Sequence, residues 1–75
     1  MKERLFRTVS QVFGVPVEEI TEQSSPETIA TWDSLKHMNL VLALEQEFGV
    51  RFTDEEIMSM VSVELLLTTL KRRAA

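Results

Sequence analysis

The chain contains no cysteine, and its 75 residues include one tryptophan, one histidine, two glycines and two prolines. The lack of cysteine excludes disulfides, thiolate metal sites and a cysteine nucleophile. Any thiol chemistry would therefore have to come from an added chemical group.

Long apolar runs are also missing. No apolar stretch approaches the roughly 20 residues that a bilayer-spanning helix needs. The charged start, Met-Lys-Glu-Arg-Leu-Phe-Arg, lacks the apolar segment of a secretory signal. We therefore expect a soluble cytoplasmic protein without membrane insertion. A chain of this length forms one domain over residues 1–75, with a core near the lower size limit for folding without disulfides or metals.

Basic residues are scarce in the body of the chain. The net charge is −4, but residues 8–70 carry −9, while residues 1–7 carry +2 and residues 71–73 carry +3. An acidic body argues against nucleic acid as a partner and favours docking to basic protein surfaces. The alternative is that these charges only keep a small protein soluble.

No segment alternates apolar and polar residues over a useful length, whereas helical periodicity recurs. The pattern predicts an all-α four-helix bundle, with longer helices at about 2–14, 34–47 and 63–72 and a short helix at about 54–60. Gly14 and Gly49 should end the first two helices. Thr53 and Glu56 should form a capping box at the third.

Residues 15–32 are predicted to form a long connecting loop, because they contain both prolines and a Thr-Glu-Gln-Ser-Ser-Pro stretch. So long a loop in a small domain tends to be functional or anchored. Its expected anchors are Val15, Val17, Ile20, Ile29 and Trp32. In the two helices near the C-terminus, the side chains expected to face inward are Ile57, Met60, Val61, Val63, Leu66, Leu67 and Leu70. Ser62 should cap the fourth helix.

A serine stands at the predicted start of the second helix. Asp33 is a suitable N-cap, because its carboxylate can accept hydrogen bonds from the free N–H groups of the first turn. Ser34 then occupies about the first helical position. A phosphate ester on its hydroxyl would lie where backbone donors and the helix dipole favour an anion.

Two apolar stripes run along this second helix when its residues are placed 100° apart. One is the expected core face and comprises Leu40, Val41, Leu44 and Phe48. The other comprises Leu35, Met38 and Leu42. Either both stripes are buried, or the second stays exposed and docks other proteins.

Two other kinds of chemistry are disfavoured. Ser34, His37 and Asp33 could suggest a serine hydrolase, but the geometry is wrong, since Asp33 is better used as a cap and no sheltered oxyanion hole is evident. His37 is expected to be packed or half-exposed at the border of the core face. The carboxylates of residues 54–56 should diverge at a helix start, so we predict no dedicated metal site.

The order of these features resembles the acyl carrier protein family. The similar segment runs without a gap from Trp32 to about Val63 and includes Asp-Ser-Leu at 33–35, Leu-Glu-Gln-Glu-Phe at 44–48 and Phe-Thr-Asp-Glu-Glu-Ile at 52–57. The resemblance implies a carrier that is not an enzyme. It implies that 4′-phosphopantetheine from coenzyme A is attached to Ser34, between Asp33 and Leu35, by a phosphopantetheinyl transferase. A monomer would then present acyl groups, as thioesters, to acyl-transferring or condensing enzymes.

The resemblance also implies two sets of contact residues. An acyl pocket would be lined by Val41, Leu44, Phe48, Phe52, Ile57, Met60 and Leu66. Partner enzymes would dock on Leu35, Lys36, Met38, Asn39, Leu42, Glu45 and Glu47.

Several positions depart from the family pattern. Carriers of primary fatty acid synthesis commonly have acidic residues where this chain has Lys36, Asn39, Gln46 and Arg51. We therefore expect a carrier for a specialised pathway, such as polyketide, modified lipid or aminoacyl or peptidyl assembly. The remaining alternative is a small helical adaptor without a prosthetic group.

Overall fold

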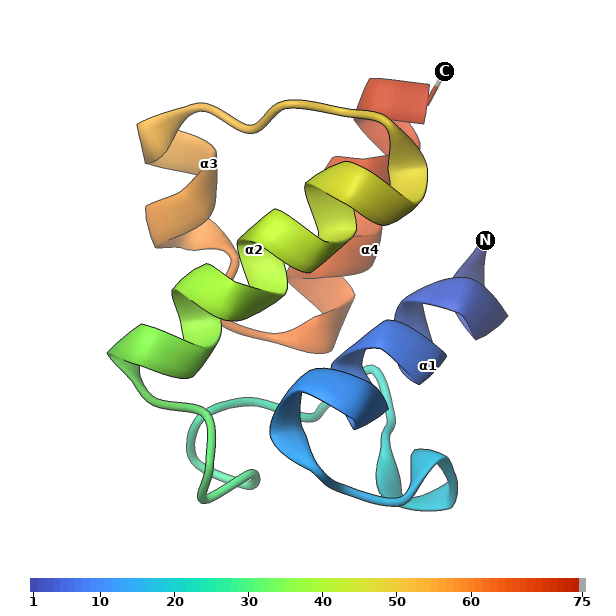
Figure 1. Cartoon of the computed structure of the whole chain (residues 1–75), viewed down its shortest axis with the longest axis vertical. Helices are drawn as coiled ribbons and strands as arrows, with labels where there is room; N and C mark the ends of the chain where they lie inside the picture. The colour runs from blue at the N-terminus through green and yellow to red at the C-terminus, as the bar shows by residue number, and fades with distance from the viewer. Residues whose placement is uncertain (75) are drawn as a thin grey trace.

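The computed structural model describes residues 1–74, and over this range it has four α-helices and no strand. The helices are α1 (Lys2–Phe13), α2 (Ser34–Phe48), α3 (Asp54–Ser59) and α4 (Val63–Ala74). Figure 1 shows α2 crossing the molecule diagonally, with α1 on one side, α3 on the other and α4 behind it. The all-α prediction is confirmed, and the observed helix ends differ from the predicted ones by one or two residues, which is the usual uncertainty of helix ends.

Both glycines end helices as predicted. Gly14 and Gly49 adopt left-handed conformations with φ of 68° and 65°, and their N–H groups bond to the carbonyls of Ser10 and Glu45. An L-residue would be strained there, whereas glycine has no Cβ to clash.

The predicted caps of the later helices are present as well. At α3, Glu56 N–H donates to Thr53 Oγ1 at 3.1 Å and Thr53 N–H donates to Glu56 Oε1 at 2.9 Å. At α4, Leu65 N–H donates to Ser62 Oγ at 3.2 Å. These bonds satisfy backbone donors that a helix start leaves without a partner.

The core lies between α1, α2 and α4, and it buries the predicted inward residues of α4. On α2, the core stripe is confirmed for Leu40, Val41 and Leu44, while Phe48 is only partly buried. The buried apolar side chains are Leu5, Val9, Phe13, Ile20, Ile29, Trp32, Leu40, Val41, Leu44, Phe52, Met60, Val63, Leu66, Leu67 and Leu70.

Two expected inward residues are in fact exposed. Val17 lies in a single turn of 3₁₀ helix, η1 (Val17–Glu19), which turns it outward. Val61 follows the end of α3, where the chain leaves the helical path and its N–H bonds to Ser59 O. Extending the helical period past a helix end therefore gave the wrong face for Val61.

The loop between α1 and α2 is anchored at both the side chains and the backbone. Ile20, Ile29 and Trp32 are buried as predicted, and Trp32 stacks on Phe13 with ring centroids 4.9 Å apart. The backbone of the loop also caps α4, because Val63 N–H donates to Ser24 O and Glu64 N–H donates to Glu22 O, both at 2.9 Å. The loop thus satisfies free donors of α4 and holds Trp32 next to the start of α2.

Arg4 joins α1 to the end of α2. Its Nε donates to Glu47 Oε2 at 2.9 Å, a terminal nitrogen donates to Glu47 O at 2.6 Å, and the guanidinium lies 4.7 Å from the Phe48 ring centre. A cation that bonds the last carbonyls of a helix complements its dipole.

Within the described residues, none of the helices has the length and apolar character needed to cross a membrane.

Candidate functional site

Ser34 is the first residue of α2, and it is exposed. The preceding Asp33 is extended, with φ −108° and ψ −174°, and its Oδ1 accepts a hydrogen bond from Lys36 N–H at 2.8 Å. The Asp33 carbonyl accepts the bond from His37 N–H that opens the helix. The predicted cap is therefore confirmed, and it leaves the Ser34 hydroxyl at the first turn, where free N–H groups and the helix dipole favour an anion.

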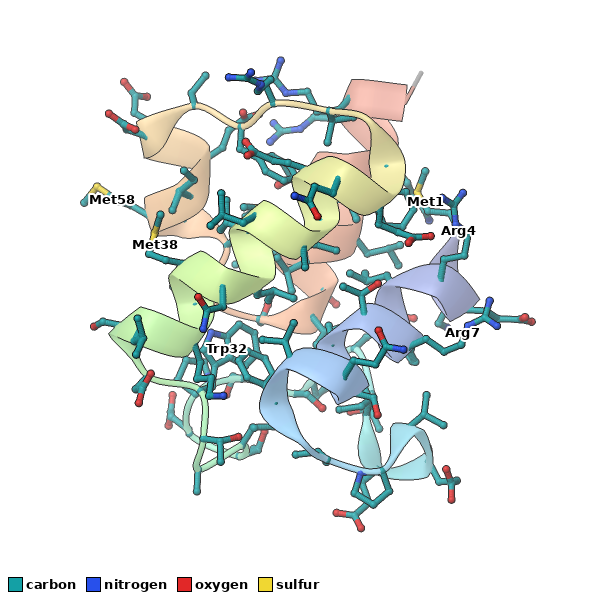
Figure 2. All side chains as sticks on the ribbon, in the orientation of Figure 1. Met1, Arg4, Arg7, Trp32, Met38 and Met58 are labelled. Carbon is teal, nitrogen blue, oxygen red and sulfur yellow. The ribbon has the colours of Figure 1, made fainter. Side chains whose placement is uncertain are left out.

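A groove of about 510 Å³ opens beside Ser34, between the start of α2 and α3. Its walls are mainly apolar and come from the loop, α2 and the end of α3. In Figure 2, Met38 lies between the start of α2 and the lower end of α3, Met58 projects outward from α3, and Trp32 lies below α2. The groove is lined by Pro26, Trp32, Asp33, Ser34, His37, Met38, Ile57, Met58 and Val61.

His37 is half-buried in this groove, and both of its ring nitrogens have partners. Nδ1 accepts the Trp32 indole N–H at 3.0 Å, and Nε2 lies 2.8 Å from Ile57 O. An indole N–H can only donate and a carbonyl can only accept, so these partners require the neutral imidazole with its proton on Nε2. Neither nitrogen is free to act as a base toward Ser34, which agrees with the rejection of a serine hydrolase.

The second apolar stripe of α2 is exposed. Leu35, Met38 and Leu42 expose 70 %, 44 % and 56 % of their surface, and Met58 and Val61, which line the groove, are exposed as well. The alternative in which both stripes are buried is therefore excluded. An exposed apolar surface of this kind is typical of a protein-binding face.

The two glutamates of the predicted docking set make contacts within the protein. Glu45 Oε2 accepts Phe52 N–H at 3.0 Å and so holds the connection between α2 and α3, while Glu47 pairs with Arg4. Lys36 is half-buried, and Asn39 is exposed near the apolar stripe. The sequence pattern did not reveal these internal roles, because the first depends on how the chain turns after α2 and the second joins residues 43 positions apart.

Most residues of the predicted acyl pocket belong to the closed core. Val41, Leu44, Met60 and Leu66 expose at most 1 % of their surface, and Phe52 is also buried. Phe48 and Ile57 are partly buried, and Ile57 is the member of the set that also lines the groove beside Ser34.

Comparison with known proteins identifies the family. A family model described as "Phosphopantetheine attachment site" matches residues 3–70. The acyl carrier protein of Buchnera aphidicola subsp. Baizongia pistaciae is 28 % identical over 72 residues, which are 96 % of this chain and 92 % of that protein. The solution structure of holo acyl carrier protein from Geobacter metallireducens superposes with a TM-score of 0.87 at 29 % identity, covering 97 % of this chain and 84 % of that one. The chain belongs to the acyl carrier protein family.

The prosthetic group of this family is 4′-phosphopantetheine. The residues at the start of α2 fit such a group, because an exposed hydroxyl at a capped helix start adjoins an apolar groove. The helix start suits the phosphate, and the groove suits an uncharged arm or its acyl group.

Proposed function

We propose that Ser34 carries the 4′-phosphopantetheine group and that the protein presents acyl groups on it to partner enzymes. The position of Ser34 is the observation that carries this proposal. It is exposed at the first turn of α2, with Asp33 already occupied as the cap and the groove alongside. The protein's membership of the acyl carrier protein family favours a carrier over an adaptor without a prosthetic group.

In the attachment reaction, Ser34 Oγ loses its proton and forms a bond to phosphorus of coenzyme A, whose nucleotide half leaves. The transferase supplies the base and the magnesium ion. When attached, the prosthetic group supplies a thiol, which this cysteine-free chain does not have, and that thiol holds acyl groups as thioesters. The first turn of α2 stabilises the phosphate charge, and the anchored helix fixes the point from which the arm extends.

The protein itself performs no catalysis in this proposal. Partner enzymes dock on the exposed stripe Leu35, Met38 and Leu42, with Lys36 and Asn39 beside it. The acidic body favours a soluble monomer, and we place its action in the cytoplasm.

We further propose a specialised pathway. Lys36 and Arg51 present positive charge where a partner with a basic docking patch needs negative charge, and such a mismatch weakens encounter and fit. Glu45 and Glu47, which could restore negative charge, are engaged with Phe52 N–H and Arg4. The pathway assembles polyketides or modified lipids, with aminoacyl or peptidyl assembly as the alternative. Mass spectrometry of the cargo distinguishes an acyl from an aminoacyl thioester.

Attachment is tested by incubating the protein with coenzyme A, magnesium and a broad-specificity phosphopantetheinyl transferase. We expect one phosphopantetheinyl group on the wild type and none on Ser34→Ala, which keeps the Asp33 cap and the helical circular dichroism spectrum. Ser59→Ala is the matched control, because Ser59 is an exposed serine of α3, and it should be modified like the wild type. A wild type that stays unmodified, or a modified Ser34→Ala, would contradict the assignment.

A further inference from the structure

The carbonyl of Ile57 is held by a side chain from another helix. Ile57 lies in the last turn of α3, where carbonyls lack partners within the helix. The Val61 N–H, which would bond to it in a continuing helix, donates to Ser59 O at 2.9 Å instead. His37 of α2 provides the bond, with its Nε2 2.8 Å from Ile57 O.

The other nitrogen of His37 is tied to the loop before α2. Trp32 donates its indole N–H to His37 Nδ1 at 3.0 Å, and the two rings are stacked. Trp32 is itself buried against Phe13 of α1. The imidazole therefore connects α3 to a ring that is fixed in the core.

His37 also lies at the end of the core face of α2. It precedes Leu40 by three residues and Val41 by four, and residues at these spacings are neighbours on one helix face. The side chains of Leu40 and Val41 are buried, whereas His37 lines the groove. His37 therefore lies between the groove beside Ser34 and the buried part of this face of α2.

We propose that His37 is a specificity-determining residue that limits the length of the acyl cargo. By holding α3 to α2 and Trp32, it keeps α2 and α3 from separating, so that a chain attached at Ser34 stays in the surface groove. The core behind it is close-packed and has little space for a guest. The preferred cargo is then a short or polar acyl group that fits the groove. This inference rests on the proposed attachment at Ser34.

The test uses acetyl, hexanoyl and dodecanoyl forms of the protein, made by the transferase from the corresponding acyl-coenzyme A. Three proteins are compared: the wild type, His37→Leu, which keeps bulk but loses both hydrogen bonds, and His37→Gln, whose amide can both donate and accept. The melting temperature and the amide chemical shifts of Leu44 and Leu66 in the core and of Met58 and Val61 at the groove are measured for each form.

For the wild type and His37→Gln, we expect a melting temperature that does not rise with chain length and shifts confined to the groove residues. For His37→Leu, we expect the dodecanoyl form to melt roughly 4 °C or more above the acetyl form, with shifts at Leu44 and Leu66. If the role of His37 were merely structural, His37→Leu would lower the melting temperature of the acetyl, hexanoyl and dodecanoyl forms by the same amount. That result, or stabilisation of the wild type by long chains with core shifts, would overturn the inference.

The wild type alone also decides the question if His37→Leu does not fold. The Trp32 indole N–H resonance reports the bond to His37 directly. We expect it at the same position in the acetyl and dodecanoyl forms, and its displacement by the long chain would contradict a closed passage. If none of the acyl forms loads at Ser34, the proposed attachment is contradicted, and this inference with it. If the forms load at Ser34 and the long chain shifts the core residues of the wild type, only the role of His37 is contradicted.

Discussion

Arg73 binds the carboxylate of Glu56 with two nitrogens and so joins the end of α4 to the start of α3. Its Nε donates to Glu56 Oε2 at 3.1 Å, and a terminal guanidinium nitrogen donates to Oε1. The same Oε1 accepts Thr53 N–H in the capping box. One carboxylate therefore fixes both the start of α3 and its position against α4. Because residues of α3 line the groove beside Ser34, this contact also holds one wall of that groove in place.

This contact predicts a pH-dependent loss of stability. The Arg73 hydrogen bond, with that of Thr53, lowers the pKa of Glu56 from 4.5 to about 2. Because the pKa is lower in the folded state, the stabilisation is fully present above pH 4.5 and is lost as the pH falls toward 2. Between these values, the melting temperature of the wild type should fall more steeply than that of Glu56→Gln.

Glu55→Gln is the matched control for this experiment. It removes the same charge from the same turn of α3 but leaves the carboxylate that binds Arg73 and Thr53. Its melting temperature should follow the slope of the wild type with pH. Equal slopes for wild type and Glu56→Gln would show that the contact with Arg73 does not contribute.

The two stripes of α2 should respond differently to truncation. Leu40 is fully buried, so Leu40→Ala should cost roughly 2–5 kcal/mol of unfolding free energy. Met38 is 44 % exposed, and Met38→Ala should cost well below that range while slowing acyl transfer to partner enzymes. Urea denaturation and a transfer assay measure the two effects. A large stability loss in Met38→Ala would show that the stripe is part of the core.

Substitution of Gly49 should destabilise the protein only because of its backbone conformation. Its φ is 65°, and a Cβ placed there would meet no atom within 4 Å. Gly49→Ala should therefore cost roughly 1–2 kcal/mol from the left-handed conformation alone. Gly49→Asn should cost less, since asparagine tolerates this conformation better. Equal losses for the two variants, measured by urea denaturation, would point to a cause other than conformation.

The charges around α2 should determine which enzymes accept the protein. Enzymes of primary fatty acid synthesis that bind carriers through basic patches should use it poorly. Replacing Lys36, Asn39 and Arg51 by Asp, Glu and Glu should raise the transfer rate, and the gain should shrink as salt is added. Efficient use of the unmodified protein by such enzymes would remove the reason for proposing a specialised pathway.

Local signals in the sequence were sufficient to predict the helices and the start of the site. Gly14, Gly49, the Thr53–Glu56 capping box and the Asp33 cap each act within a few residues, so their roles follow from spacing alone. Periodicity within one long helix predicted the two apolar stripes of α2 but left open whether the second is exposed, which the structure shows. Val61 was assigned wrongly, because the helical period stops at the end of α3.

The contacts that shape the groove could not be predicted in the same way. His37 was expected at the border of the core, but its bonds to Trp32 and Ile57 depend on how the loop and α3 lie against α2. The pairing of Arg4 with Glu47 joins residues 43 positions apart. Such contacts depend on tertiary packing, for which helical periodicity and caps carry no signal.

The most direct test of the central proposal is intact-protein mass spectrometry of the chain purified from its native host, followed by fragmentation to locate any added mass. The account predicts one 4′-phosphopantetheine group per chain, located on Ser34, with an acyl thioester on part of the population. A protein without the group, or with the group on another residue, would contradict it.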